Sequence, residues 1–320
     1  MTESYPGSPD PWGAPAGGYQ VPPRVQGQLT EPLISPDYHG WWSRGLSIAK
    51  RGWKPLALLQ AVGVGVTLLA QAPVAAYTAL ASDDFNQQAG TADPNRLPDL
   101  APLFSLFGWT LVALLLALVI AAMVTLASVH IGVSVAVGAE VRVAGVLRLA
   151  ARRVFPLLGW QLLAIPIYVV AVCLCVVPVF YVAAVFVVLP VVVAVERSGA
   201  IGRCFSLFHH DLGSSVARVA TIFGLTLAGA LVGGVFGAVV NAGALAAWPG
   251  TGGIIGGAVV STLLSALAGG AIAILLAPLT LTAYADMRAR HEPLTTMTVA
   301  HELGITAPPA ESWSPWPPGT

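Results

Sequence analysis

The stretch AWPGTGG, from Ala247 to Gly253, lies in the middle of the longest uncharged part of the sequence. No Asp, Glu, Lys or Arg occurs from Val219 to Ala285. A transmembrane helix needs about 20 apolar residues, each rising about 1.5 Å. The block is therefore long enough for two such helices. Because Trp, Pro and Gly are typical of a turn at the membrane interface, the stretch predicts a hairpin of two transmembrane helices.

The composition of the whole chain indicates a membrane protein. Of its 320 residues, 56% are hydrophobic and only 9% are charged, and the mean hydropathy is +0.77. Soluble domains carry about 25% charged residues. The net charge is zero, which removes the electrostatic argument for a nucleic acid partner. We expect a multi-pass protein of the plasma membrane.

The charges between the uncharged blocks predict the topology. The blocks are 55–81, 103–139, 154–195 and 219–285, and basic residues flank them everywhere except in the acidic segment 82–102. The positive-inside rule puts the basic segments in the cytoplasm and segment 82–102 outside. The first two blocks then cross once and the last two cross twice. This predicts an all-α protein with six transmembrane helices and both termini cytoplasmic, because a β-barrel would need alternating polarity.

Three regions follow from this topology. We expect a disordered Pro/Gly-rich tail over 1–36, a six-helix membrane domain over 37–305 and a disordered Pro-rich tail over 306–320. The expected spans are 55–81, 104–130, 154–176, 178–195, 219–246 and 254–285, and the third block is expected to break near Pro178.

Three cytoplasmic segments resemble one another and precede the first, third and fifth expected helices. Each carries a polar or basic pair at an equivalent position: Lys50–Arg51, Arg152–Arg153 and His209–His210. The pattern predicts three repeated units, each an interfacial amphipathic helix followed by a transmembrane hairpin. The partners of the basic residues would be anionic lipid headgroups. The alternative is that these segments are positively charged loops that only set the topology.

Small residues recur at a spacing of four along the last two expected helices. They are Gly229, Gly233 and Gly237 on the fifth helix and Gly253, Gly257, Ser261, Ser265 and Gly269 on the sixth. Such faces let two helix backbones approach closely within a membrane. We expect these two helices to pack on each other, and the alternative is that one face mediates dimerisation.

Candidate catalytic and metal-binding patterns are incomplete. The sequences HEPLT and HELGI begin like the zinc motif HExxH, but Thr295 and Ile305 stand in place of the second His. The adjacent His209 and His210 point about 100° apart on a helix, so they do not share a metal. We therefore expect a protein that is not an enzyme and that needs no metal or cofactor. The polar candidates within the expected spans are Gln60, Gln71, His130, Gln161 and Asn241.

Charges return abruptly in LTAYADMRARHEP, from Leu281 to Pro293. Alternate positions suggest a strand at first, but on a helix Asp286 meets Arg290 and Arg288 meets Glu292, both at i, i+4. We predict that the last helix continues into the cytoplasm and that these residues, with Tyr284, form a structural clasp of the bundle.

The same residues carry a family resemblance. Tyr284, Asp286, Arg288, Arg290 and Glu292 form a Y-x-D-x-R-x-R-x-E ending after the last helix. This ending resembles that of standalone actinobacterial integral membrane proteins related to the membrane domain of glycerophosphoryl diester phosphodiesterase. Looser similarity extends over residues 45–59, 138–153 and 190–207, so that the resemblance covers about residues 40 to 305. The chain departs from the family pattern at His209–His210 and at Pro293.

The resemblance implies a six-helix membrane module without a phosphodiesterase barrel, so diesterase activity is not carried over. Our first hypothesis is a non-catalytic integral membrane module. It would scaffold or anchor an unidentified membrane or cytoplasmic protein partner, or organise lipid at the inner membrane surface. The alternative is a small permease for an apolar or lipid-like substrate, with a cavity lined by Gln60, Gln161 or Asn241. A third alternative is a membrane-embedded phosphodiesterase.

Overall fold

The computed structural model describes residues 31–91, 101–196, 199–210 and 212–306. Every regular element in these ranges is a helix, and six helical segments are long and apolar enough to cross a membrane. The predicted all-α class is thus confirmed for the described residues, and the six candidate spans equal the predicted number. The predicted tails lie outside the described residues over 1–30 and 307–320.

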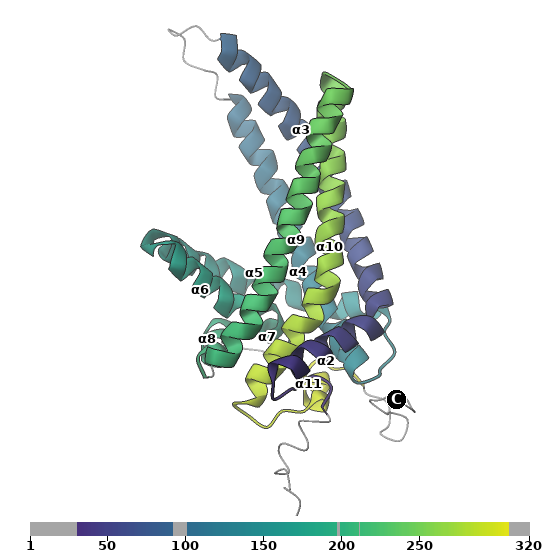
Figure 1. Cartoon of the computed structure of the whole chain (residues 1–320), viewed down its shortest axis with the longest axis vertical. Helices are drawn as coiled ribbons and strands as arrows, with labels where there is room; N and C mark the ends of the chain where they lie inside the picture. Colours follow the sequence, from purple (N-terminus) through teal and green to yellow (C-terminus); the bar gives the residue numbers. More distant parts are fainter. Residues whose placement is uncertain (1–30, 92–100, 197–198, 211, 307–320) are drawn as a thin grey trace, which may run out of the picture.

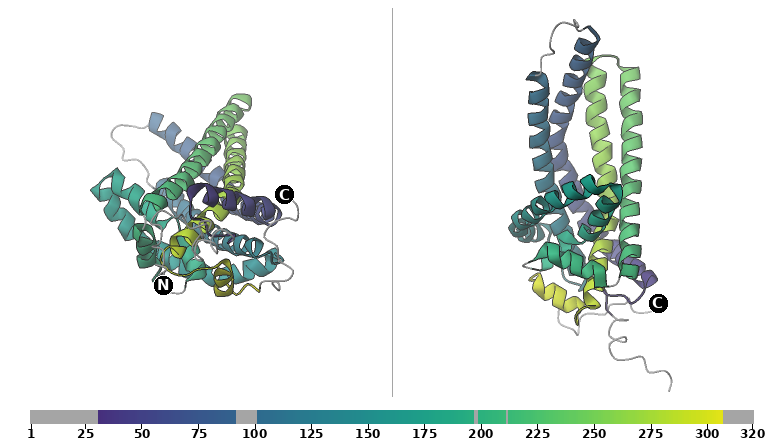
Figure 2. Two further views of the ribbon diagram at one scale, coloured as in Figure 1. Left: turned by 60° about the horizontal axis from the view of Figure 1, so that its bottom comes forward. Right: turned by 90° about the vertical axis from the view of Figure 1, so that its left-hand side faces the viewer.

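Four long helices run side by side (Figures 1 and 2). They are α3 (Trp53–Thr91), α4 (Ala101–Ala136), α9 (Leu212–Ala247) and α10 (Thr251–Ala289). α10 contacts both α9 and α3, and α3 contacts α4. At about 1.5 Å per residue these helices are about 54 to 58 Å long, which exceeds the hydrocarbon thickness of about 30 Å. The expected spans 55–81, 104–130, 219–246 and 254–285 therefore lie inside longer helices.

The predicted turn between the last two helices is present. α9 ends at Ala247 and α10 begins at Thr251, so the connection is only Trp248–Gly250. Gly250 has φ 96°, in the left-handed region where a residue without Cβ is favoured. The uncharged block 219–285 thus folds back on itself near its centre.

The third uncharged block differs from the prediction. It forms α5 (Val143–Leu174), α6 (Val176–Phe186) and α7 (Leu189–Val195). The figures show α5 and α6 lying across the long helices rather than along them (Figures 1 and 2). The expected span 154–176 and the interfacial segment before it are one continuous helix, α5. The expected span 178–195 corresponds to the candidate span Val177–Val195, which is interrupted between α6 and α7.

The break in this block lies at Cys175, three residues before Pro178 and at the start of the stretch CVVPVF in which it was predicted. Cys175 has φ 142° and separates α5 from α6. Pro178 is the third residue of α6, where its missing N–H costs no hydrogen bond because first-turn N–H groups have no partner within the helix. A proline therefore marked the start of a helix rather than its interruption.

Three shorter helices gather where α9 begins and α10 ends, which we call the charged end (Figure 1). They are α2 (Tyr38–Arg51), α8 (Ala200–His210) and α11 (Thr296–Glu302). α2 begins at its cap Asp37, which accepts a hydrogen bond of 2.8 Å from the Gly40 N–H. α2 and α8 are separate helices before α3 and α9, whereas the middle interfacial segment is the start of α5. The threefold repeat therefore stays a prediction.

The first described residues belong to the packed domain. Leu33 and Ile34 are buried in the main hydrophobic core, and Ser35 is 3% exposed. The Ser35 N–H donates to the Asp286 carboxylate. The predicted tail boundary at residue 36 is therefore wrong, because two apolar side chains and one backbone donor find partners just before α2.

The α9–α10 contact uses the predicted small residues of α9. Gly229, Gly233 and Gly237 are all buried. A Cβ on Gly229 would overlap the Ile272 side chain, and a Cβ on Gly237 would lie 3.3 Å from Ser265 Oγ. The Ser265 hydroxyl also donates to the Gly233 carbonyl at 3.4 Å. The two backbones thus approach closely along one stripe.

On α10 the contact face departs from strict fourfold spacing. Gly257 lies against Asn241 and Ala244, Gly253 lies under the turn, and Ser261 lies against Gly237. No atom of another helix lies within 4 Å of a Cβ built on Gly269, and this residue lines a cavity instead, so it lies outside the α9–α10 contact. Four residues turn a helix by about 400°, so strict fourfold spacing drifts by about 40° per step. The face therefore continues through Ala268 and Ile272.

Candidate functional site

The last two turns of α10 form the most polar buried region of the charged end. All residues from Leu281 to Arg288 are buried, including Tyr284 and Asp286. α10 continues to Ala289, so Asp286 and Arg288 lie on the helix as predicted, whereas Arg290 is its C-cap and Glu292 lies in the turn that follows. Because successive residues point in different directions, Tyr284 and Arg288 share one side and Asp286 lies on another.

Tyr284 and Arg288 are at the centre of an ion-pair network. The Tyr284 hydroxyl donates to Glu196 Oε1 at 2.8 Å and accepts from Arg288 Nη1 at 3.1 Å. Arg288 Nε donates to Glu292 at 2.7 Å, the predicted pair. We call the network the Tyr284 cluster, with members Glu196, Arg203, Tyr284, Arg288, Glu292 and Glu302.

Two further members bring neighbouring elements into the cluster. Arg288 binds Glu302 of α11 through two nitrogens, at 2.5 and 2.8 Å. Arg203 of α8 lies 2.9 Å from Glu196 and also pairs with Glu292. The two-point contact between a guanidinium and a carboxylate fixes their relative orientation. The cluster therefore joins α8, α10, α11 and the residue after α7.

The charges of the cluster favour its ionised state. Desolvation opposes ionisation of Glu292, but its hydrogen bond to Arg288 and the charges of Arg288 and Arg203 outweigh it, so the pKa of Glu292 lies below its usual value. For Arg203, burial opposes the charge, but Glu196 and Glu292 raise the pKa above its usual value. Each of these groups therefore stabilises the ionised form of its partners.

Asp286 belongs to a second site. Its Oδ2 lies 2.7 Å from Arg218 Nη2 of α9, and both side chains are at most 2% exposed. Arg218 also lies 6.0 Å from the centre of the Trp41 ring on α2. The prediction named Arg290 as the partner of Asp286, but the close ion pair is with Arg218. The Arg290 guanidinium donates to the Pro36 carbonyl at 3.4 Å.

The sequence contains a signal that predicts the Arg218–Asp286 pair. Arg218 and Asp286 are the first charged residues on either side of the uncharged block 219–285. A block that crosses the membrane twice brings its two ends to the same side, so its flanking charges of opposite sign meet. Glu196 and Glu302 offered no comparable signal, since α7 and α11 reach the cluster only through tertiary packing.

The predicted interfacial residues divide into exposed and engaged groups. Lys50, Arg51 and Arg152 are exposed, whereas Arg153 is half-buried and donates to the Val193 and Glu196 carbonyls at 3.5 Å. His209 contacts the Tyr181 hydroxyl through its ring at 2.7 Å. The rings of His210 and His291 are 3.8 Å apart. The basic surface is therefore made by α2 and the start of α5.

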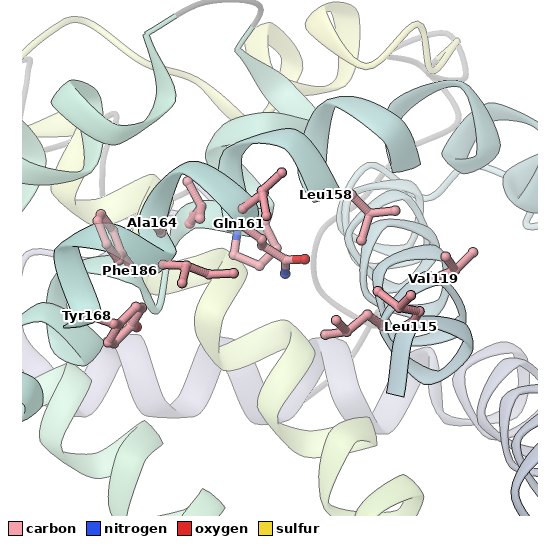
Figure 3. Close-up of a pocket in the computed structure, with 12 residues that line it drawn as sticks. Leu115, Val119, Leu158, Gln161, Ala164, Tyr168 and Phe186 are labelled. Atoms are coloured by element: carbon pink, nitrogen blue, oxygen red, sulfur yellow. The ribbon is translucent and has the colours of Figure 1, made fainter. Parts of the chain in front are cut away.

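Cavities lie between the helices, away from both ion-pair sites. One of them has about 540 Å³ and is lined by α4, α5, α6 and α7, with Gln161 on its wall (Figure 3). Two smaller cavities of about 340 and 260 Å³ share Gln60 and lie between α3, α4 and α10. Three residues were predicted to line a substrate cavity. Gln161 lines the first cavity and Gln60 lines the other two, whereas Asn241 lies in the α9–α10 contact.

Within the described ranges, no three His, Cys, Asp or Glu side chains gather in a way that would hold a metal ion. No protein-family model, curated protein or solved structure matches the chain. The resemblance to the membrane domain of glycerophosphoryl diester phosphodiesterase therefore stays a prediction, and function rests on the geometry of the sites.

Proposed function

We propose that the protein is a non-catalytic integral membrane module that organises anionic lipid at the inner surface of the plasma membrane. In this proposal both termini are cytoplasmic, and the lipid-bound surface is also where a membrane or cytoplasmic protein partner is anchored. The observation that carries it is the separation of charges at the charged end. Acidic and basic side chains of the Tyr284 cluster bind one another, whereas basic side chains of α2 and α5 are exposed.

The exposed basic side chains suit lipid headgroups. Lys50 and Arg51 end α2, Lys54 follows at the start of α3, and Arg148 and Arg152 lie on α5. Each basic residue near an anionic membrane surface contributes about 1 kcal/mol of attraction. The buried apolar side of α2, with Trp41 and Ile48, fixes that helix to the bundle. The bundle thus supports a fixed array of positive charges.

The test measures lipid that stays bound to the full chain after extraction from membranes of mixed anionic and zwitterionic lipid. We expect retained phosphatidylglycerol, and its loss in a variant carrying Lys50→Gln, Arg51→Gln, Lys54→Gln, Arg148→Gln and Arg152→Gln. The control is Glu140→Gln with Arg142→Gln, which removes one exposed charge of each sign. Recovery of a monomer with neither anionic lipid nor a protein partner would reject the proposal.

A second function, a small permease for an apolar or lipid-like substrate, is favoured by the two cavities that share Gln60. Gln60 is 9% exposed, and Thr67, Thr125 and Thr280 lie on the same cavity walls. The test is transport in reconstituted vesicles, comparing the native chain with Gln60→Leu. Flux that is unchanged by this substitution would remove the support that the cavities give.

A further inference from the structure

The cavity between α4 and α5 has a mostly apolar wall, in which Gln161 and Tyr168 are the residues with polar side-chain atoms. Figure 3 shows Gln161 between Leu115 and Val119 of α4 on one side and Tyr168 and Phe186 on the other. None of the lining residues carries a charge. Such a wall accepts a hydrocarbon chain and excludes an ionised headgroup, because an unpaired charge in an apolar site is strongly unfavourable.

The Gln161 amide has unused hydrogen-bonding capacity. Its Oε1 is buried and has no hydrogen-bond partner among the described residues. A buried acceptor without a partner destabilises the site until a donor reaches it. The same side chain carries two N–H donors, so it can both accept from and donate to one hydroxyl group. The cavity therefore favours a ligand with an uncharged group that donates a hydrogen bond.

The size and opening of the cavity fit a ligand from the bilayer. Its volume of about 540 Å³ lies within the range of about 300 to 1,000 Å³ that is usual for small-molecule sites. Leu162 and Ile165 on its rim are 68% and 52% exposed. Exposed leucine and isoleucine beside a cavity in a membrane protein face acyl chains, so access from the lipid phase requires no polar path.

We infer that this cavity binds a lipid alcohol, a molecule with a long apolar chain and an uncharged hydroxyl headgroup. The hydroxyl donates to Gln161 Oε1, and the chain lies between α4 and α5 against Leu158 and Phe186. The inference deepens the lipid-organising function proposed above, but it uses none of the basic side chains of α2 or α5. The lipid-alcohol site and the lipid-organising function can therefore be tested separately.

The test uses the full chain in zwitterionic nanodiscs with a diacylglycerol that carries a photoreactive acyl chain. We expect crosslinks to α4 and α5 near Leu115, Val119 and Gln161. Unlabelled diacylglycerol should compete about tenfold better than its O-methyl ether, which has the same shape but no donor. That ratio corresponds to about 1.4 kcal/mol, within the range for one hydrogen bond. Phosphatidic acid should compete weakly.

Substitutions test the role of the amide. Gln161→Leu should weaken competition by diacylglycerol about tenfold and remove its advantage over the ether. Gln60→Leu makes the same change in a different cavity and should leave labelling unchanged. Ala164→Trp, which fills the cavity, should abolish labelling at α4 and α5. Thermal unfolding of each variant in detergent checks that the fold is retained.

Several results would overturn the inference. They are equal competition by the alcohol and its ether, equal competition by phosphatidic acid, crosslinks spread over all lipid-facing helices, or full selectivity in Gln161→Leu. Anionic lipid retention is measured on the same variants. Gln161→Leu should keep it, whereas loss of anionic lipid with intact diacylglycerol selectivity would reject the proposed function and leave this site standing.

Discussion

The α9–α10 hairpin and the charged end are held together in different ways. Along the hairpin, small residues such as Gly233 and Gly257 let backbones touch, and the contact contains no ion pair over the block 219–285. At the charged end, Arg218 and Arg288 meet carboxylates at 2.7 Å or less. Within lipid, close van der Waals packing is available without any charge to desolvate. Ion pairs appear where the same helices leave that environment.

Breaking the buried pair should have the largest effect. Arg218→Ala leaves Asp286 without its ion-pair partner, and an unpaired buried charge costs about 3 to 5 kcal/mol. Unfolding of the variant in detergent, followed by a denaturant titration, should show this loss. Arg218→Met combined with Asp286→Leu should recover most of the stability, because neither charge remains. A double variant as unstable as Arg218→Ala would contradict the role of the pair.

Filling the hairpin contact should have the next largest effect. Gly257→Leu places a side chain against Asn241 and Ala244, and overpacking of this kind costs about 1 to 3 kcal/mol. Gly256→Leu is the matched control, since no atom of another helix lies within 4 Å of a Cβ at that residue. We expect thermal stability in detergent to fall only for Gly257→Leu. Equal losses in both variants would show that helix packing is not responsible.

Removing one hydroxyl from the Tyr284 cluster should have a smaller effect. Tyr284→Phe deletes the contacts to Glu196 and Arg288, for an expected loss of about 1 kcal/mol. Tyr38→Phe is the control, because its hydroxyl contact to Thr221 is exposed. The same denaturant titration measures both. A loss in Tyr38→Phe as large as that in Tyr284→Phe would argue against a special role of the cluster.

The pH dependence of the charged end should be the smallest effect. Because the pKa of Glu292 is lower in the folded protein than its usual value of about 4.3, its contribution is complete above that pH. The contribution is lost as the pH falls through the lower folded value. Thermal unfolding between pH 3 and 6 should therefore be less pH-dependent in Glu292→Gln, whereas Glu140→Gln, at an exposed site, should match the native chain.

The long helices were predictable because their signal is local. Uncharged blocks flanked by basic residues identify α3, α4, α9 and α10 without any knowledge of their neighbours. The course of α5 to α7 was not predictable in the same way. An apolar segment has the same composition whether it runs along the bundle or across it, and the break at Cys175 carries neither Gly nor Pro.

The contacts of the candidate sites also differ in whether the sequence predicts them. The Arg288–Glu292 pair follows from helical spacing, and the Arg218–Asp286 pair follows from the two ends of one hairpin. The contacts of Arg288 with Glu302, and of Tyr284 with Glu196, depend on how α11 and α7 pack. The cavity lined by Gln161 depends on the crossing of α4 by α5, which no periodicity in the sequence describes.

The Ser35–Asp286 hydrogen bond joins residues that are 251 positions apart. A ribosome adds about 5 to 20 residues per second, so Asp286 is synthesised about 12 to 50 s after Ser35. During that interval the Ser35 N–H lacks the carboxylate to which it donates in the folded protein. The hydrogen bond that joins the start of the domain to the charged end can therefore form only after nearly all of α10 has been synthesised.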